Sequence, residues 1–359
     1  MTHVQIIAEA GVNHNGSLDM ALALVDAAAA AGVDVVKFQT FNARKLASAD
    51  APKAAYQVRQ TGAGESQLAM LERLQLSLPD HQAIIARCQA NGIAFLSTPF
   101  DFDSLALLTD VLKLDVLKIG SGELTNAPML LALARSGRRL ILSTGMGTLG
   151  EVEDALGVLA FGMVASSDTV PSRQAFASAL HDAAAWSLLR DRVTLLHCTT
   201  EYPAAVAHTN LRAMQTMRQA FGLEVGYSDH TEGAAVSIAA VAMGATVIEK
   251  HVTLDRKLPG PDHAASVEPG ELASLVRDVR AVELALGSGI KQPGTAERAN
   301  RPVARKSLVA ARDLGAGHVL TAADIEVKRP GSGRSPFLLW EAIGLRLTRA
   351  YRAGEPLDP

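Results

Sequence analysis

Short apolar, β-branched runs alternate with longer Ala- and Leu-rich stretches over residues 1–286, and this alternation restricts the fold more than any other feature of the sequence. A short run followed by a helical stretch is typical of a βα unit, and repeated units build a parallel sheet. We expect eight strands, at residues 4–11, 33–40, 94–100, 116–122, 139–145, 193–199, 224–230 and 246–253. Helical stretches between them include 20–31, 79–91, 103–112 and 127–136. Eight units predict an α/β fold, a (β/α)8 TIM barrel rather than an open doubly wound sheet.

Two further segments depart from the barrel pattern. Residues 287–305 are rich in Gly, Pro and charge, so we expect a linker there. Residues 306–359 alternate short apolar runs with turn signals, which predicts a small β-rich domain whose core alone is marginal. The catalytic barrel is therefore expected at 1–286. Inside it, 161–190 is longer than one βα connection requires, and we assign that segment no role.

Composition disfavours several classes of protein. The 34 Lys and Arg residues against 37 Asp and Glu give a net charge of −3, which provides no global field for nucleic acid or an anionic membrane. No apolar run approaches the roughly 20 residues of a membrane span. The two cysteines, Cys88 and Cys198, lie far apart in apolar runs, so we expect free thiols and a reducing compartment. With no basic and apolar leader before the first expected strand, we expect a cytoplasmic protein.

Two histidines stand at the ends of the last two expected strands, His230 and His251. Barrel enzymes hold their chemistry at the carboxyl ends of the strands, and successive strands end beside each other. The two imidazoles can therefore converge on one ion, and imidazole suits Mn²⁺, Zn²⁺ or Fe²⁺. The sequence predicts a divalent metal site at this pair, and a structural hydrogen bond is the alternative for each histidine.

Two lysines occupy strand positions where a buried barrel would normally carry Val or Ile. Because an unpaired buried ammonium is costly, Lys37 and Lys118 indicate a buried anion such as phosphate or carboxylate. Ser121, Ser143 and Ser228 add hydroxyl donors at neighbouring strand ends. A Schiff base formed by either lysine is the competing chemistry, which the histidine pair disfavours.

Two carboxylates stand at the same rim, Glu9 and Glu123. Each could be a general base, a metal ligand or the salt-bridge partner of a lysine. We favour a catalytic role more for Glu9, because no basic residue adjoins it in the sequence.

Eight separated motifs resemble the sialic acid synthase family, also called nonulosonic acid synthases. In order, they are Ala8-Glu-Ala-Gly-Val-Asn-His-Asn-Gly, Lys37-Phe-Gln-Thr-Phe, Phe95-Leu-Ser-Thr-Pro-Phe, Lys118-Ile-Gly-Ser-Gly-Glu, Leu142-Ser-Thr-Gly-Met, His197-Cys-Thr-Thr-Glu-Tyr-Pro, Gly226-Tyr-Ser-Asp-His-Thr and Glu249-Lys-His. The later Val327-Lys-Arg-Pro-Gly-Ser-Gly resembles the antifreeze-protein-like domain that follows the barrel in that family. Members condense phosphoenolpyruvate with an N-acetylated amino-sugar aldehyde, which gives a nine-carbon 2-keto acid and phosphate.

The resemblance implies a role for each rim residue. It implies catalysis by Glu9, Lys37, Lys118 and Glu123, and phosphoenolpyruvate binding by Lys37, Lys118, Ser121, Ser143 and Ser228. It implies sugar binding by Gln39, Glu123, Tyr202, Asp262 and Arg329, and Mn²⁺ at His230 and His251. It also implies a domain-swapped homodimer, in which the small domain brings Arg329 to the barrel of the partner subunit.

Four more motifs resemble the N,N′-diacetyllegionaminate branch of that family, namely Tyr56-Gln, Glu65-Ser-Gln-Leu, Thr125-Asn and Asp262-His-Ala-Ala-Ser-Val-Glu-Pro. The implied acceptor is a 2,4-diacetamido-trideoxy-mannose, and N-acetylmannosamine, used by the N-acetylneuraminate branch, is the alternative. Thr200 stands where some bacterial members have asparagine. A metal-dependent pyruvate aldolase and a non-catalytic carbohydrate-binding protein are the competing hypotheses from other classes.

Overall fold

The computed structural model describes residues 3–48, 51–53, 58 and 64–358. The chain divides into two compact units, Met1–Gly287 and Ser288–Pro359. The Tyr56-Gln motif lies outside the described residues. Within the described part of the chain, no helix is both long and apolar enough to cross a membrane.

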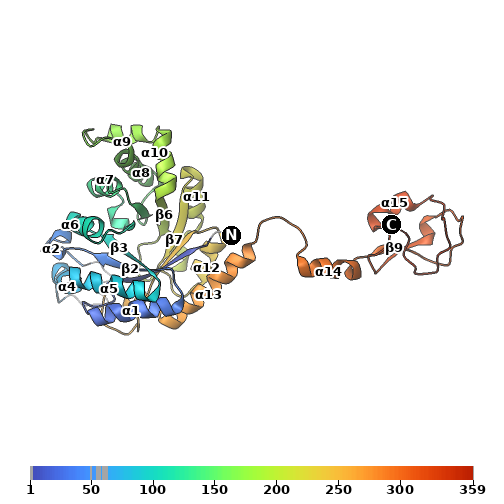
Figure 1. Ribbon diagram of the computed structural model, residues 1–359, viewed down its shortest axis with the longest axis horizontal. Helices are drawn as coiled ribbons and strands as arrows, with labels where there is room; N and C mark the ends of the chain where they lie inside the picture. Colours follow the sequence, from blue (N-terminus) through green and yellow to red (C-terminus); the bar gives the residue numbers. More distant parts are fainter. Residues whose placement is uncertain (1–2, 49–50, 54–57, 59–63, 359) are drawn as a thin grey trace. The chain divides into compact units, whose positions relative to one another are not determined.

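Eight parallel strands form one sheet in the first unit (Figure 1). They are β1 (Gln5–Gly11), β2 (Val35–Thr40), β3 (Ala94–Pro99), β4 (Val116–Ile119), β5 (Arg139–Ser143), β6 (Val193–Cys198), β7 (Glu224–Asp229) and β8 (Val247–His251). Their order in the sheet is β3-β2-β1-β8-β7-β6-β5-β4, and β3 and β4, at its two ends, also contact each other. The sheet is thus a nearly closed barrel, which confirms the predicted fold.

Helices surround this barrel (Figure 1). They are α1 (Leu18–Ala31), α2 (Ala43–Leu46), α4 (Gln67–Leu74), α5 (Leu78–Asn91), α6 (Phe102–Ala106), α7 (Ala127–Arg135), α8 (Leu149–Val164), α9 (Arg173–Ala179), α10 (Ala183–Arg192), α11 (Arg212–Phe221), α12 (Ala235–Ala242) and α13 (Pro269–Leu286). Local sequence sets several of their ends. Capping boxes begin α5 at Ser77 and α8 at Thr148, and Gly32 ends α1 in the left-handed conformation.

Three local features differ from the expected pattern. The helix expected at 103–112 is α6 followed by a π-helical turn, Leu107–Val111. The fourth strand ends at Ile119, because Ser121–Glu123 fold into a 3₁₀ turn at the barrel rim. The long segment 161–190 contains the end of α8, all of α9 and most of α10, and both later helices pack against α8.

Side chains inside the barrel form two layers of opposite character. The lower layer is apolar and consists of Ile7, Val35, Leu96, Ile141, Leu196 and Val247. Because alternate residues of a strand share a face, the residues two positions further along these strands also point inward. They form the polar layer of Glu9, Lys37, Thr98, Ser143, Cys198 and Glu249. The apolar layer closes the barrel from below, so the polar layer becomes the floor of a cavity at the carboxyl ends.

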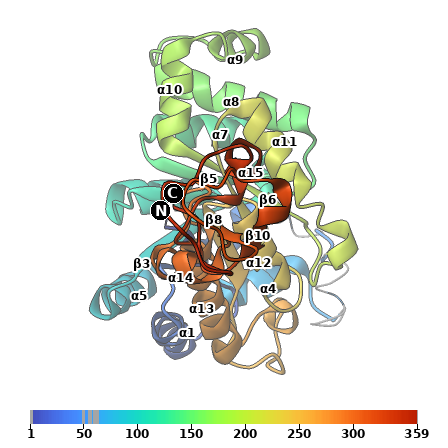
Figure 2. The same ribbon diagram turned by 90° about the vertical axis from the view of Figure 1, so that its right-hand side faces the viewer.

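The second unit has a small core of its own. It begins with α14 (Thr295–Ala304), within the segment where a linker is expected, and continues into the antiparallel pair β9 (Ser307–Ala310) and β10 (Ile325–Lys328). The unit also contains the short helix α15 (Leu339–Ala342), and Figure 2 labels both α15 and β10. The buried apolar side chains are Leu308, Ala310, Leu314, Leu320, Ile325, Ala342, Leu347, Tyr351 and Leu357.

Candidate active site

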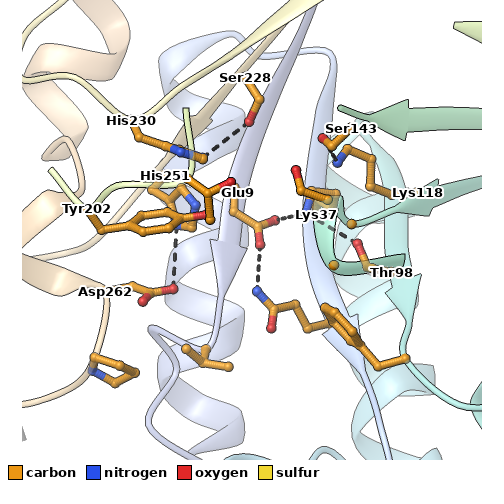
Figure 3. A pocket seen from close by; sticks show the side chains of 18 of the residues that line it. Glu9, Lys37, Thr98, Lys118, Ser143, Tyr202, Ser228, His230, His251 and Asp262 are labelled. Atoms are coloured by element: carbon orange, nitrogen blue, oxygen red, sulfur yellow. Dashed lines mark hydrogen bonds and ion pairs between the residues drawn. The ribbon is translucent and has the colours of Figure 1, made fainter. Parts of the chain in front are cut away.

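A cavity of about 320 Å³ opens at the carboxyl ends of the barrel strands. Figure 3 shows side chains from several strands pointing into it. Most of the residues predicted from the sequence line this cavity, namely Glu9, Lys37, Gln39, Lys118, Ser121, Ser143, Tyr202, Ser228, His230, His251 and Asp262. The structure therefore brings together residues that are up to 253 positions apart, because each follows or ends a strand of the same barrel.

Two lysines and two carboxylates form a buried charge cluster at the cavity floor. Lys37 Nζ lies 2.6 Å from Glu9 Oε2 and 3.7 Å from Glu249 Oε2. Lys118 Nζ lies 3.7 Å from Glu249 Oε1, and no side chain of the four is more than 5% exposed. Within the chain, Glu9 is thus a salt-bridge partner of Lys37, which was one of the alternatives for that carboxylate.

Hydroxyl groups complete the surroundings of this cluster. Lys118 donates to Ser143 Oγ at 2.6 Å, and Ser228 donates to Glu249 Oε1 at 2.9 Å. Lys37 also donates weakly to Thr98 Oγ1, at 3.4 Å. Figure 3 shows the side chains of Lys37, Thr98, Lys118, Ser143 and Ser228 around the same cavity.

Burial and neighbouring charge separate the pKa values of the two carboxylates. Burial raises the pKa of Glu9 above its ordinary value, and the Lys37 charge offsets this only in part. Burial acts in the same direction on Glu249, but Lys118 and Lys37 together overcome it and lower the pKa of Glu249 to about 2. Glu249 therefore stays ionised near neutral pH, whereas Glu9 takes up a proton more readily. A carboxylate with a raised pKa is suited to general acid–base chemistry.

The two lysines also differ. Burial lowers the pKa of Lys118. Burial alone would do the same to Lys37, but Glu249 and Glu9 outweigh it and raise the pKa of that lysine. Lys37 is accordingly held as an ammonium by two carboxylates, and Lys118 gives up its proton more easily.

The two predicted metal ligands lie side by side, with 5.3 Å between the centroids of His230 and His251. Tyr202 covers both, with its ring centroid 4.2 Å from His230 and 5.6 Å from His251. His230 Nδ1 is 2.6 Å from Thr199 O, and this carbonyl can only accept, so the Nε2 lone pair is available.

These histidines fit a divalent cation. Burial lowers the pKa of His230 to about 4 and that of His251 to about 3, so both imidazoles are neutral near pH 7, as metal ligation requires. His251 Nδ1 is buried and has no hydrogen-bond partner among the described residues. Over the same residues no group of three or more His, Cys, Asp or Glu forms a metal site. The chain thus offers two imidazoles, and solvent or substrate must supply the other ligands.

A loop after β8 places Asp262 at the cavity wall. Asp262 Oδ2 lies 3.7 Å from His251 Nδ1, and burial raises the pKa of this carboxyl to about 7. Ser266 donates to Asp262 O at 2.7 Å, and Asn13 donates at 2.8 Å to both Ser266 Oγ and Val252 O. The β1–α1 turn therefore fixes the loop that carries Asp262.

One predicted residue is not brought into this cavity, and another belongs to the second unit. Glu123 is not among the residues that line it, and its carboxylate accepts a hydrogen bond from Asn126 at 2.6 Å. The reason is the 3₁₀ turn at Ser121–Glu123, which ends the strand earlier than expected. Arg329 belongs to the second unit, where it precedes Pro330.

Two parts of the cavity were not predicted from the sequence, namely Glu249 and an apolar wall. Glu249 stands two positions before His251 on β8 and so shares its inward face, and this spacing is the signal that could have identified it. The wall comes from α2, α4 and the β1–α1 turn and consists of Val12, Leu46, Met70, Leu71 and Leu74. The alternating pattern of the strands does not predict this wall, because its residues lie outside the barrel strands.

A nearly closed parallel barrel, with buried lysines and paired imidazoles around one cavity at the strand ends, is typical of barrel enzymes. Residues 24–291 match the NeuB family, and residues 305–359 match the SAF domain. The chain belongs to the NeuB family, and the resemblance to sialic acid synthases is confirmed.

Individual relatives agree with this assignment. The chain is 45% identical to an N,N′-diacetyllegionaminic acid synthase of Campylobacter jejuni, over 99% of both chains. It is 43% identical to the protein of the same name from Legionella pneumophila, over 98% of this chain and 92% of the relative. A solved N-acetylneuraminic acid synthetase from Leptospira borgpetersenii, in complex with citrate, is 32% identical with a TM-score of 0.66, over 83% of this chain and 90% of that one.

Proposed function

We propose that the protein condenses phosphoenolpyruvate with 2,4-diacetamido-2,4,6-trideoxy-mannose, forming N,N′-diacetyllegionaminate and phosphate. The observation that supports this most strongly is the 45% identity to the Campylobacter jejuni synthase over 99% of both chains. N-acetylmannosamine is the second candidate acceptor, favoured by the 32% identity to the Leptospira synthetase.

The charge of the cavity supports a divalent cation in addition to the substrate. Lys37 and Lys118 are already balanced by Glu9 and Glu249, so these four side chains supply no net positive charge. A phosphate monoester carries about −1.5 to −2 at neutral pH, and the carboxylate of phosphoenolpyruvate adds another negative charge. A cation at the two neutral imidazoles compensates for this charge, and Mn²⁺ is the metal we expect from the family resemblance.

Phosphoenolpyruvate is proposed to lie over the polar layer. Lys37 and Lys118 supply charge-assisted donors for its phosphate and carboxylate, and Ser121, Ser143 and Ser228 supply neutral ones. Because these donors come from β2, β4, β5 and β7 and from the turn after β4, they can hold both ends of the substrate in one orientation.

Carbon 3 of phosphoenolpyruvate then forms a bond to the aldehyde carbon of the sugar, using the π electrons of the enol and leaving carbon 2 electron-poor. The π bond of the aldehyde breaks, and its oxygen takes up a proton and becomes a hydroxyl. When bound, the cation would supply Lewis-acid polarisation of the aldehyde oxygen. Water adds at carbon 2, and the bond between carbon 2 and the phosphate oxygen breaks, which releases phosphate and leaves the 2-keto acid.

Glu9 is the proposed acceptor of the proton from that water. Its pKa is raised by burial, and its Oε1 accepts a hydrogen bond from Gln39 at 3.0 Å, which orients the carboxylate. The Lys37 ammonium, 2.6 Å from the other oxygen, favours the ionised form of Glu9, which is the form that accepts the proton.

The acceptor sugar is proposed to contact Gln39, Tyr202 and Asp262 at the cavity wall. Glu123 and Arg329 remain proposed sugar contacts. We also propose a homodimer in which Arg329 reaches the site of the other subunit. Phe337 and Trp340, 91% and 77% exposed in the second unit, offer apolar surface for such an interface. Since phosphoenolpyruvate is a cytoplasmic metabolite, the proposed location is the cytoplasm.

Phosphate release and product mass test this function together. Protein loaded with Mn²⁺ is incubated with phosphoenolpyruvate and the diacetamido sugar, and we expect equal amounts of phosphate and nine-carbon acid. A pyruvate-joining aldolase would consume the sugar with pyruvate and release no phosphate. A carbohydrate-binding protein would bind the sugar without turnover, and its binding would be unaffected by His230→Ala or His251→Ala.

A further inference from the structure

A buried ion pair lies directly behind the two histidines, between β7 and β8. Lys250 Nζ is 2.9 Å from Asp229 Oδ2, and the two side chains are 1% and 0% exposed. Asp229 and Lys250 are partners in the register of these two strands. Each is followed in the chain by a histidine, and because successive residues face opposite sides, His230 and His251 point into the cavity.

The ion pair also holds Thr231, the residue that follows His230, by hydrogen bonds. Asp229 Oδ1 accepts from Thr231 N at 2.9 Å and from Thr231 Oγ1 at 2.7 Å. Lys250 Nζ donates to Thr231 O. Asp229 Oδ2 accepts a further bond from Ser237 Oγ of α12, at 2.6 Å. The residues immediately before and after His230 are therefore both held by this one cluster.

Filling the space between β7, β8 and the surrounding helices does not require charged side chains such as Asp229 and Lys250. The space between a parallel sheet and its helices is normally filled by apolar side chains, as Tyr227 and Ile248 do on the same two strands. Replacing a buried ion pair by apolar residues of similar volume is often neutral for stability, since the desolvation cost is removed with the attraction. What apolar residues do not provide is a directional link between two strand ends. A metal site needs such a link, because ligand distances must be correct to about 0.2 Å.

We propose that Asp229 and Lys250 are positioning residues, whose ion pair sets the relative placement of His230 and His251 so that both imidazoles can hold one divalent cation. The inference rests on the proposed metal site. It assigns a role to two residues behind the expected histidine pair. In this role, Asp229 and Lys250 act through the histidines and contact neither cation nor substrate.

Metal affinity, measured without substrate, tests this inference. The whole protein is titrated with Mn²⁺ by calorimetry, and the double variant Asp229→Leu with Lys250→Met replaces the pair by apolar side chains. We expect a folded protein whose melting temperature is lowered by the hydrogen bonds that Thr231 and Ser237 lose, and an Mn²⁺ affinity weaker by about 10- to 100-fold, the usual effect of losing the groups that orient metal ligands. The absorption spectrum of bound Co²⁺ is expected to change in the same variant, because the ligand geometry changes.

The Asp34–Arg280 pair provides the matched control. Arg280 NH2 lies 2.7 Å from Asp34 Oδ2 near the amino end of β2, away from the strand ends that carry the histidines. Asp34→Asn is expected to lower the melting temperature and to leave the Mn²⁺ affinity unchanged. A general loss of stability is thereby separated from a loss of positioning.

The outcomes distinguish this inference from the function beneath it. Wild-type affinity in the folded double variant would overturn the positioning role and leave the metal site intact. Absence of Mn²⁺ binding by the wild type would overturn both. If the double variant does not fold, Asp229→Asn replaces it, since it keeps the side-chain shape and one acceptor. Unchanged affinity in that folded variant would equally contradict the inference.

Discussion

Replacement of Glu249 by Gln tests the charge balance of the cavity floor. Glu249 lies between Lys37 and Lys118 and is the residue to which no role was given from sequence. Gln keeps the shape and one acceptor, so Ser228 retains its hydrogen bond. The substitution therefore removes the charge and little else.

The size of the effect follows from the two ammonium contacts. At 3.7 Å and an effective dielectric of about 20, each contact between opposite charges is worth about 4.5 kcal/mol. Desolvation of the carboxylate offsets several kcal/mol, and removing one partner of a buried pair costs about 3–5 kcal/mol in net terms. Lys37 keeps its contact with Glu9, and Lys118 can release its proton, so we expect the lower end of this range. That is about 3 kcal/mol, or roughly 5 °C in the Tm of the unit Met1–Gly287.

Denaturant unfolding with and without phosphoenolpyruvate is the assay. Since the variant leaves the lysines short of negative charge, the anion should restore part of the lost stability and stabilise Glu249→Gln more than the wild type. Glu123→Gln is the control. We expect its stability to change by no more than about 0.5–1 kcal/mol, because among the described residues that carboxylate accepts a hydrogen bond from Asn126 at the rim and pairs with no lysine. Equal stability of wild type and Glu249→Gln, or equal stabilisation of both by the anion, would refute the charge balance described for the cavity.

Two further predictions concern single side chains. Lys118→Gln removes a charged donor beside Ser143. We expect KM for phosphoenolpyruvate, from initial-rate measurements, to rise by about 10- to 100-fold. An unchanged KM would show that this lysine does not bind the anion. In the second unit, hydrogen bonds from His318, Thr321 and Arg312 hold the pKa of Asp324 well below its ordinary 3.8. The stability from this depressed pKa is full above about pH 4 and is lost at lower pH, so Asp324→Asn should flatten the acid dependence of unfolding followed by Trp340 fluorescence; an unaltered acid profile would contradict this.

The barrel could be predicted from the sequence because its strands are short apolar runs separated by helical stretches of regular length. All eight expected strands overlap observed ones, and the largest difference is at the fourth, which ends at Ile119. The 3₁₀ turn that follows depends on backbone hydrogen bonds from Glu123 and Leu124 to Gly120 and Ser121. The Gly-Ser-Gly run at 120–122 is a turn signal, but it specifies neither the type of turn nor the residue at which the strand ends.

The cavity could be predicted in outline because strand ends of a barrel converge. The charge cluster could be predicted only in part. A salt bridge from Glu9 to a lysine was one alternative, but which lysine it contacts, and the pairing of Lys118 with Glu249, depend on the radius of the barrel and on the register of β1, β2, β4 and β8. Lys37 and Lys118 were expected to face a substrate anion, and the structure adds carboxylates of the chain itself. The pKa separation of Glu9 from Glu249 likewise arises only from this three-dimensional arrangement.

The central claim is the choice of substrates, and a comparison of catalytic efficiency with two sugars tests it most directly. Phosphate release is measured with phosphoenolpyruvate, Mn²⁺ and either 2,4-diacetamido-2,4,6-trideoxy-mannose or N-acetylmannosamine, each over a range of concentrations. We expect a clearly higher kcat/KM for the diacetamido sugar. A higher value for N-acetylmannosamine would move the protein to the neuraminate branch, and no phosphate release with either sugar by metal-loaded protein would contradict the proposed reaction.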